Sequence, residues 1–196
     1  MSDRLNQQLD FLYEVDKMKS VLRQTLILDK SRHENTAEHS WHFALMTVVF
    51  FEYCQLDNVD LNRVIRMALI HDLVEIYAGD TFAYDVKGNE EKELREQQAA
   101  DKIFSMLPPD QAKEYRTLWE EFDKMDTNDA KYASAIDRLH PFLSNSKSEG
   151  YTWSKHNVTL DQVYERMDPV RVAAPKLWEL VESIISNALK KGYIVY

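Results

Sequence analysis

Two side chains able to bind metal, His71 and Asp72, are neighbours inside the largely apolar run 68–75. His39 precedes them by about thirty residues, and Asp137 follows by about sixty-five. Neutral imidazole and ionised carboxylates are natural ligands of divalent cations. A histidine, a His-Asp pair and a further aspartate, in that order, predict a hydrolytic divalent-metal site.

The His-Asp pair falls near the end of an expected helix, on the face that we predict to be buried. Asp60 can cap this helix, which should continue to about Tyr77 and end at Gly79. Its apolar face consists of Leu61, Val64, Ile65, Met67 and Ala68. Extending that face by about 3.6 residues per turn leads to the pair and then to Glu75. Because buried unpaired charges are strongly destabilising, a cation is expected to compensate them.

The other two candidate ligands are also predicted to face inward. His39 stands at the start of another helix, which Thr36 can cap and whose apolar body covers 41–53. Asp137 continues an apolar face formed by Ala130, Ala133 and Ile136. Pro141 has no N–H to donate to the carbonyl of Asp137, so the helix should bend there. The bend either turns the carboxylate of Asp137 toward the site or only fits the helix around the core.

The remaining histidines lack a supporting pattern. We assign His42 to helix packing, and His33, His140 and His156 to the surface or to the surroundings of the ligands. The single cysteine, Cys54, is expected in the core among aromatic residues. One cysteine forbids an intramolecular disulfide and suits a reducing cytoplasm, which is the expected location because no signal peptide is visible.

Helical periodicity dominates the chain and strand-like alternation is nearly absent, so the predicted fold class is all-α. Four glycines and five prolines in 196 residues leave room for long helices. Helices are expected at 5–22, 36–53, 60–77, 90–106, 110–125, 129–146, from a capping box at 159–162, and from 175 to 191. The segments 29–35, 81–88 and 145–157 are expected to be irregular. No linker or repeat is visible, which favours one domain.

Charge and hydropathy limit the partners. The formal net charge of −9 argues against binding long nucleic acid, which requires clustered Lys and Arg. The longest apolar run, 43–51, is too short to cross a membrane. A small phosphorylated ligand remains compatible, because a metal and one or two local arginines can hold a monophosphate.

The pattern of His39, His71, Asp72 and Asp137 resembles the H…HD…D signature of the HD-domain phosphohydrolases. The strings Glu-Asn-Thr-Ala-Glu-His-Ser at 34–40 and His-Asp-Leu-Val-Glu-Ile-Tyr-Ala-Gly-Asp at 71–80 are similar to the bacterial 5'-deoxynucleotidase and oxetanocin-like branch. The similarity spans about residues 5–145.

The resemblance implies a single HD domain over 1–196, a helical bundle with the metal site between core helices. Its core motifs would lie at about 30–145, with C-terminal helices over 159–191 packed on them. It also implies that His39, His71, Asp72 and Asp137 hold one divalent metal ion. Mixed N and O ligands fit Mn, Co, Fe, Ni, Zn or Mg.

Two acidic residues after the His-Asp pair match the catalytic acids of the family, Glu75 and Asp80. Glu75 shares the helix face of the pair, where a general acid/base would act on water. Its alternative role is to steer His71. Asp80 would orient the water or contact the sugar, or else cap its loop.

The resemblance also implies substrate-binding arginines. Arg32 matches a basic position before the His39 string and would pair with phosphate, unless it is a surface residue. The family carries an Arg-aromatic pair near the end of the first helix, and Arg23-Gln24 is the nearest match. Arg23 would bind phosphate, while the missing aromatic ring leaves the preference for deoxyribose open.

The predicted function is metal-dependent hydrolysis of nucleoside 5'-monophosphates. The enzymatic alternatives are a triphosphohydrolase and a cyclic-nucleotide phosphodiesterase; a di-iron oxygenase would need further ligands. A non-catalytic, metal-braced helical interaction module is the alternative outside enzymes. Small members of the branch resemble homodimers, to which Trp178, Tyr193 and Tyr196 would contribute if they are not core residues.

Overall fold

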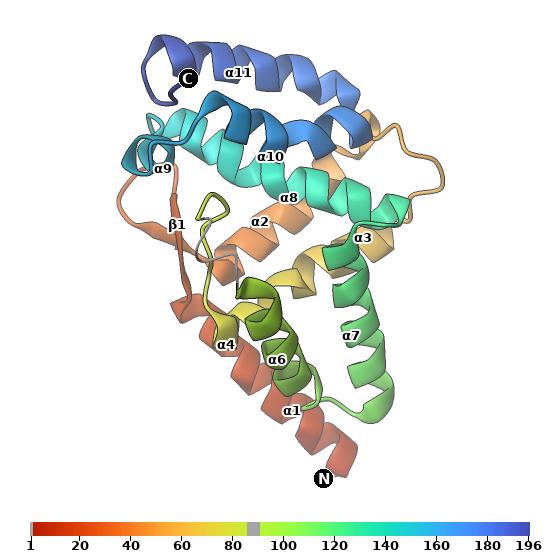
Figure 1. Cartoon of the computed structure of the whole chain (residues 1–196). Helices are drawn as coiled ribbons and strands as arrows, with labels where there is room; N and C mark the ends of the chain where they lie inside the picture. The colour runs from red at the N-terminus through yellow and green to blue at the C-terminus, as the bar shows by residue number, and fades with distance from the viewer. Residues whose placement is uncertain (1, 86–90) are drawn as a thin grey trace.

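Helices make up most of the chain in the computed structural model, which describes residues 2–85 and 91–196 (Figure 1). The α-helices are α1 Asp3–Val15, α2 Thr36–Val49, α3 Leu61–Ile70, α4 Glu75–Ala78, α6 Lys92–Phe104, α7 Pro109–Lys124, α8 Asn128–Lys147, α9 Tyr151–Lys155, α10 Leu160–Ala173 and α11 Trp178–Lys190. Short 3₁₀ segments are η1 Asp16–Ser20, η2 Phe51–Tyr53, η3 His71–Val74 and η4 Pro175–Leu177. The all-α prediction is confirmed.

A small antiparallel hairpin departs from the predicted pattern. Strand β1, Leu22–Leu26, pairs with β2, His33–Asn35, in a sheet of two strands. The predicted first helix therefore ends earlier, and part of the predicted loop 29–35 is strand. Five residues and three residues are too few for a clear period of two, which is why the sequence pattern missed them.

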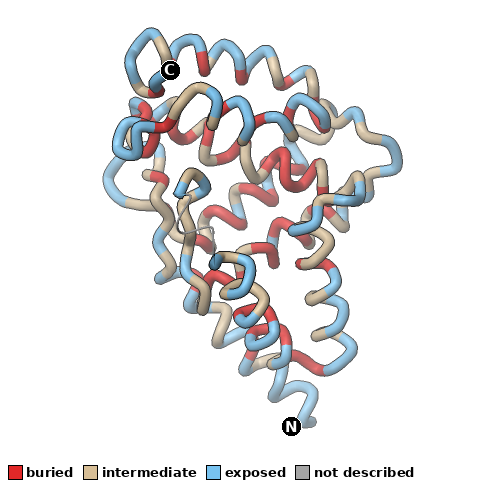
Figure 2. Tube along the Cα trace, in the orientation of Figure 1, coloured by how far each residue is buried: buried red, intermediate tan, exposed pale blue. Residues whose placement is uncertain are grey.

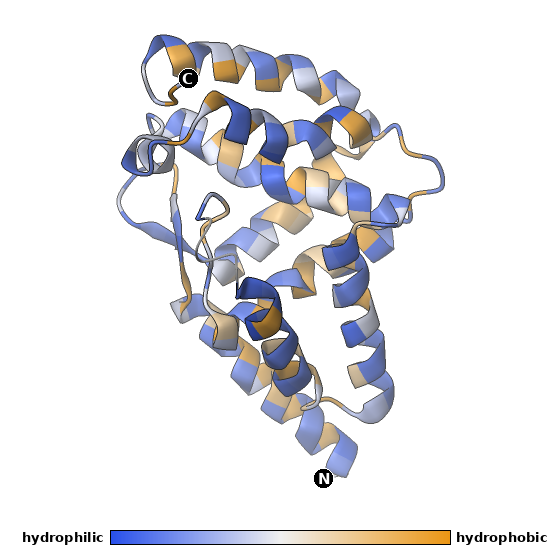
Figure 3. Cartoon of the chain, in the orientation of Figure 1, coloured by the Kyte–Doolittle hydropathy of each residue, from blue (hydrophilic) through white to orange (hydrophobic). Residues whose placement is uncertain are grey.

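The core lies where α8 packs against α2, α3 and α10 (Figures 1 and 2). Large fully buried side chains come from all four helices, among them Phe43, Met67, Ile136, Leu139 and Met167. Helices α6 and α7 are mostly hydrophilic (Figure 3) and bury narrow apolar faces. Helix α8 thus connects the HD motif segments with the C-terminal helices.

Caps fix where the helices that carry the candidate ligands begin. Asn35, not Thr36, caps α2: its side chain accepts from the N–H of Glu38 at 3.0 Å, and Glu38 accepts from the N–H of Asn35 at 3.2 Å. This capping box sets His39 in the first turns of α2. The predicted cap at Asp60 and the predicted capping box of Thr159 and Gln162 are confirmed.

Several predicted boundaries need correction. The predicted loop 145–157 is wrong, because α8 continues through Pro141 to Lys147 and α9 follows. Helix α6 begins at Lys92. The end of the predicted irregular segment 81–88 and the predicted helix start at 90 lie outside the described residues. Cys54 is half-buried at the edge of the core rather than enclosed in it. Across the described residues, we find no helix with the length and apolar character needed to span a bilayer.

The turn before α9 requires glycine for two reasons. Gly150 has φ of 66°, and a Cβ there would lie 2.4 Å from Cβ of Tyr193. Gly192, with φ of 70°, would meet nothing within 4 Å. Substitution of Gly192 therefore measures backbone strain alone, whereas substitution of Gly150 adds a steric clash with Tyr193.

We therefore expect Gly150→Ala to be much more destabilising than Gly192→Ala. The left-handed conformation alone costs an L-residue about 1–2 kcal/mol, and overpacking adds about 1–3 kcal/mol. At about 2–4 °C per kcal/mol, Gly192→Ala should lower Tm by roughly 2–8 °C and Gly150→Ala by roughly 4–20 °C in thermal unfolding. Equal losses in the two proteins would show that Tyr193 does not occupy the turn.

Candidate metal centre

The four predicted ligands meet between α2, η3 and α8. Nε2 of His39 lies 3.0 Å from Oδ1 of Asp137 and 3.7 Å from Oδ2 of Asp72. Nε2 of His71 lies 3.1 Å from Oδ1 of Asp72 and 3.6 Å from Oδ1 of Asp137. Adjacent ligands bound at about 2.1 Å to one cation are about 3–3.5 Å apart. The contacts at 3.0 and 3.1 Å match this spacing and the other two are slightly longer; His39, His71 and Asp72 form a group that could hold a metal ion, and Asp137 lies beside it.

The predicted continuous helix through the His-Asp pair is interrupted. Helix α3 ends at Ile70, the pair opens η3, and α4 begins at Glu75 and ends before Gly79, whose φ is 76°. In a 3₁₀ turn the side chains of residues i and i+3 eclipse. Asp72 and Glu75 are three apart, so the tighter turn brings both carboxylates to one side.

His71 is oriented as a ligand. Its Nδ1 donates to the carbonyl of Ala68 at 2.9 Å, while its Nε2 is buried without a hydrogen-bond partner. A bond that holds the other ring nitrogen typically fixes a ligating histidine. Burial disfavours charge on this ring, but the carboxylates of Asp72 and Asp137 outweigh it and raise the pKa of His71 to about 10. The site thus attracts positive charge at Nε2, and the residues present fit a divalent cation.

The two aspartates keep their negative charge. Burial alone would raise their pKa values, but the charge of His71 beside both carboxyls, and the hydrogen bond from His39 to Asp137, hold the pKa of each well below its usual range. Ionised carboxylates are the form that a cation requires.

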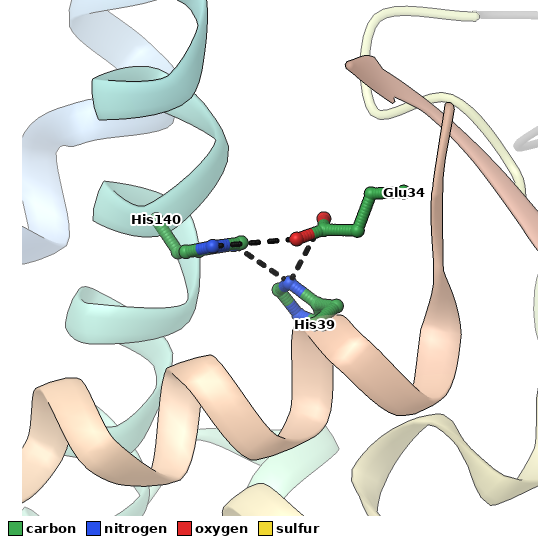
Figure 4. A group of neighbouring side chains, drawn as sticks. All are labelled: Glu34, His39 and His140. Atoms are coloured by element: carbon green, nitrogen blue, oxygen red, sulfur yellow. Dashed lines mark hydrogen bonds and ion pairs between the residues drawn. The ribbon is translucent and has the colours of Figure 1, made fainter. Parts of the chain in front are cut away.

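A row of imidazoles extends from His39 away from the cluster. Nδ1 of His39 lies 2.8 Å from Nδ1 of His140, and Nε2 of His140 lies 2.9 Å from Nδ1 of His42. Figure 4 shows His39 and His140 facing each other, with Glu34 beside them. Burial lowers the pKa of His39 to about 4 and that of His140 well below its usual value, so both rings are neutral.

The contact of His39 with Asp137 determines which ring nitrogen carries the hydrogen in each of the three histidines. A carboxylate can only accept, so the contact with Asp137 needs a hydrogen on Nε2 of His39. His39 then accepts at Nδ1 from His140, and His140 accepts at Nε2 from His42. The assignment of His42 to helix packing alone therefore missed its contact with His140.

Glu34 is a buried acid whose role the sequence did not reveal. Its carboxylate lies 3.8 Å from Nδ1 of His39 and 3.5 Å from Nε2 of His140. Burial raises the pKa of Glu34 to about 7, against the opposing charge of Arg23. Glu34 belongs to the string that carried the family resemblance, but nothing in its spacing marked it as a neighbour of His140.

Glu75 and Asp80 both line the cavity beside the cluster. Burial and the charge of Asp72 raise the pKa of Glu75 well above its usual value. Thr36 contacts Oε2 of Glu75 at 3.1 Å and the carbonyl of Val21 at 3.2 Å. The hydroxyl has one hydrogen, so a protonated Glu75 donating to Thr36 satisfies both contacts. Burial also raises the pKa of Asp80, which accepts from the N–H of Gln24.

Of the two predicted arginines, the structure brings Arg23 to the site. Its side chain, 14% exposed, donates to Oδ2 of Asp72 at 2.8 Å. Further carboxylate oxygens lie 3.7 Å away in Glu34, 4.0 Å in Glu75 and 3.8 Å in Asp80. Strand β1 positions Arg23, so the hairpin, which was not predicted, supplies the guanidinium group among these acids.

The predicted role of Arg32 needs correction. Its guanidinium pairs with both carboxylate oxygens of Glu38 on the surface and is not among the residues that line the cavity. Because Glu38 belongs to the capping box of α2, Arg32 supports the helix start and does not reach a ligand at the cluster.

The cavity beside the cluster has a volume of about 230 Å³. Arg138 and Arg166 also line it, together with Tyr84 and Trp153, none of which the sequence singled out. Burial lowers the pKa of Arg138 to about 10, still above neutrality. The position of Arg138 directly after a candidate ligand was an available signal; the other three come from segments without a recognised motif.

Comparison with known proteins shows the family and the fold of the chain. A family model described as HD domain matches residues 15–178. The 5'-deoxynucleotidase HDDC2 of Homo sapiens is 32% identical over 142 residues, which cover 72% of this chain and 68% of the human protein. A crystal structure of a predicted metal-dependent phosphohydrolase from Magnetospirillum magnetotacticum MS-1 has 45% sequence identity and a TM-score of 0.93, covering 98% of this chain and 96% of that one. A conserved hypothetical protein from Pyrococcus furiosus, 22% identical with a TM-score of 0.67 over 90% of this chain and 98% of its own, shares the fold.

Proposed function

The chain belongs to the HD domain family and is an enzyme of its phosphohydrolase class, and from this premise we propose that it hydrolyses nucleoside 5'-monophosphates to nucleoside and phosphate in a metal-dependent reaction. The observation that carries the proposal is the cluster of His39, His71, Asp72 and Asp137 beside a cavity that is also lined by Glu75, a carboxyl group whose pKa is raised by burial. The names of the relatives support a nucleotide as substrate.

We propose that His39, His71, Asp72 and Asp137 hold one divalent cation. A cation bound there would polarise the phosphoester and make a nearby water more acidic. The ligand set suits Mn, Co, Fe, Ni, Zn or Mg, and the choice among these metals stays a prediction.

We assign proton transfer to Glu75. In the reaction a water oxygen bonds to phosphorus, the bond from phosphorus to the 5' oxygen breaks, and a proton passes from the water to the nucleoside. Glu75 lies in a buried site that raises its pKa, which suits a group that exchanges a proton near neutral pH. Its partner Thr36 keeps the carboxyl directed along the cavity wall.

Asp80 and Arg23 complete the acidic side of the site. Asp80, anchored by the N–H of Gln24, is proposed to orient the water or the sugar. The positive charge of Arg23 is balanced by the acidic side chains around it. Its main proposed role is therefore to hold Asp72 and Glu75 in place. Only those N–H groups that its carboxylate neighbours leave free can reach phosphate.

The alternatives predict different behaviour. A metal-braced interaction module would gain nothing from burying Glu75 and Asp80 beside the cluster, since buried carboxyl groups cost stability. A triphosphohydrolase or cyclic-nucleotide phosphodiesterase would share the cluster but turn over a different nucleotide. Two further proposals concern the whole chain: that 1–196 acts as one domain, since α10 packs on α8, and that the protein is a homodimer.

Metal removal tests the function directly. Protein stripped with a chelator should lose hydrolysis of nucleoside 5'-monophosphates by at least about a hundredfold and regain it with Mn or Co, because metal ions contribute several kcal/mol to such reactions. A panel of mono-, tri- and cyclic nucleotides, assayed with each metal, identifies the substrate class. A thermal shift with metal but no turnover of any phosphoester would instead establish the structural brace.

A further inference from the structure

We propose that Arg138 and Arg166 form an anion-binding wall that holds the phosphate group of the substrate against the metal cluster. The inference rests on the proposed function and assigns its phosphate contact to two residues outside the HD signature. Both arginines line the same cavity as His71 and Asp72, but they come from α8 and α10.

The acidic side of the cavity has little free positive charge to offer an incoming anion. Arg23 lies within 4.0 Å of carboxylates from Asp72, Glu75, Asp80 and Glu34. A phosphate approaching from this side would meet the charge of Asp72, which already holds Arg23, and like charges repel strongly where little water screens them.

The two arginines from α8 and α10 are less closely paired. Arg138 donates to weak or neutral acceptors, the carbonyl of Arg166 at 3.4 Å and the sulfur of Met125 at 3.4 Å. The carboxylates of Asp137 and Asp168 act on it from beyond hydrogen-bond distance. Arg166 has one carboxylate nearby, Oδ2 of Asp137, at 3.9 Å. Among the described residues, neither guanidinium has a carboxylate within hydrogen-bond distance, in contrast to Arg23.

The charge of Arg166 acts against that of Arg138, and an anion bound by both would remove that cost. Their planar N–H groups match the oxygens of phosphate in pairs. The contact of Arg166 with Asp137 fixes where such an anion would lie, because the other oxygen of Asp137 faces His39 and His71. A phosphate held by the arginines is therefore next to the candidate ligands.

The test measures phosphate affinity separately from turnover. Inorganic phosphate is titrated calorimetrically into the metal-loaded full chain, and KM is measured on a nucleoside 5'-monophosphate. The variants are Arg166→Gln, Arg138→Gln and Arg138→Lys. Arg171→Gln is the matched control, because Arg171 lies on α10 but pairs on the surface with Asp168. Metal affinity and Tm are measured for each variant without phosphate.

Each glutamine variant should weaken phosphate binding and raise KM by about tenfold or more, as expected for a lost charge-assisted hydrogen bond. Arg138→Lys should retain part of the affinity, and Arg171→Gln should match the wild type. Because Arg166 is 32% exposed, its glutamine variant should fold even if the Arg138 variants do not.

Wild-type phosphate affinity in Arg166→Gln overturns the proposal, as does a loss of phosphate binding that only follows a loss of metal. Failure of the metal-loaded wild type to bind phosphate also overturns it. Failure of the wild type to hydrolyse any nucleotide, with phosphate binding that still depends on these arginines, would reject the proposed function and leave the anion-binding wall in place.

Discussion

Asp72→Asn is expected to reduce kcat/KM on nucleoside 5'-monophosphates by at least about a thousandfold, equivalent to about 4 kcal/mol of transition-state stabilisation. Asp72 contacts His71, His39 and Arg23 at once, so its charge both completes the ligand set and balances the guanidinium. The neutral amide keeps the shape of the side chain but not its attraction for a cation. Steady-state kinetics at saturating metal measures the loss.

Calorimetric titration with Mn should show the cause, since the variant should bind the ion much more weakly than the wild type. Asp168→Asn is the matched control, because Asp168 is exposed and its ion pair is with Arg171 on the surface. Circular dichroism establishes that both proteins fold. Full activity in a folded Asp72→Asn protein would remove Asp72 from the ligand set.

Glu75→Gln is expected to lower kcat by about 10²–10⁴-fold while metal affinity stays close to that of the wild type. Glutamine can keep the contact with Thr36, but it cannot exchange a proton. The separation of kcat from metal affinity is the informative result. It distinguishes a proton carrier from a carboxylate that only steers His71, whose loss would weaken the metal first.

Glu96→Gln serves as the control for Glu75, because Glu96 also lines the cavity but pairs with Lys92 at 3.6 Å on α6. Its kcat should stay within a few-fold of the wild type. Wild-type kcat in Glu75→Gln would exclude Glu75 as the group that moves the proton.

The sequence pointed to three of the candidate ligands, His71, Asp72 and Asp137, because they follow apolar helical faces. The faces leading to His71 and Asp137 are buried in the structure as expected, at Val64 and Ala68 and at Ala133 and Ile136. What periodicity could not show is the change from α to 3₁₀ at His71, since i and i+3 positions share a face in both helices. The eclipsed relation of Asp72 and Glu75 depends on that local tightening.

Contacts between distant segments were harder to predict than helix faces. Arg32 was favoured for phosphate because it stands near the His39 string, yet it pairs with Glu38 of its own helix start. Arg23 reaches the acids because β1 pairs with β2. So short a strand shows no clear alternation of apolar and polar residues from which the pairing could be predicted. Arg166 is in the C-terminal region without a motif, and only the packing of α10 on α8 brings it to the cavity.

The imidazole row also makes the chemistry of a buried ligand depend on a residue at the edge of the fold. For His39 to present the lone pair of Nε2 to a cation, its hydrogen has to occupy Nδ1, and His140 and His42 then have to exchange their tautomers as well. His42 is half-buried and does not line the cavity, but it is the point where this rearrangement meets the solvent. A side chain that both donates and accepts, such as glutamine, can follow the reversal, whereas leucine would remove the last partner. Evolutionary exchange at His42 should therefore be restricted by hydrogen-bond polarity rather than by volume.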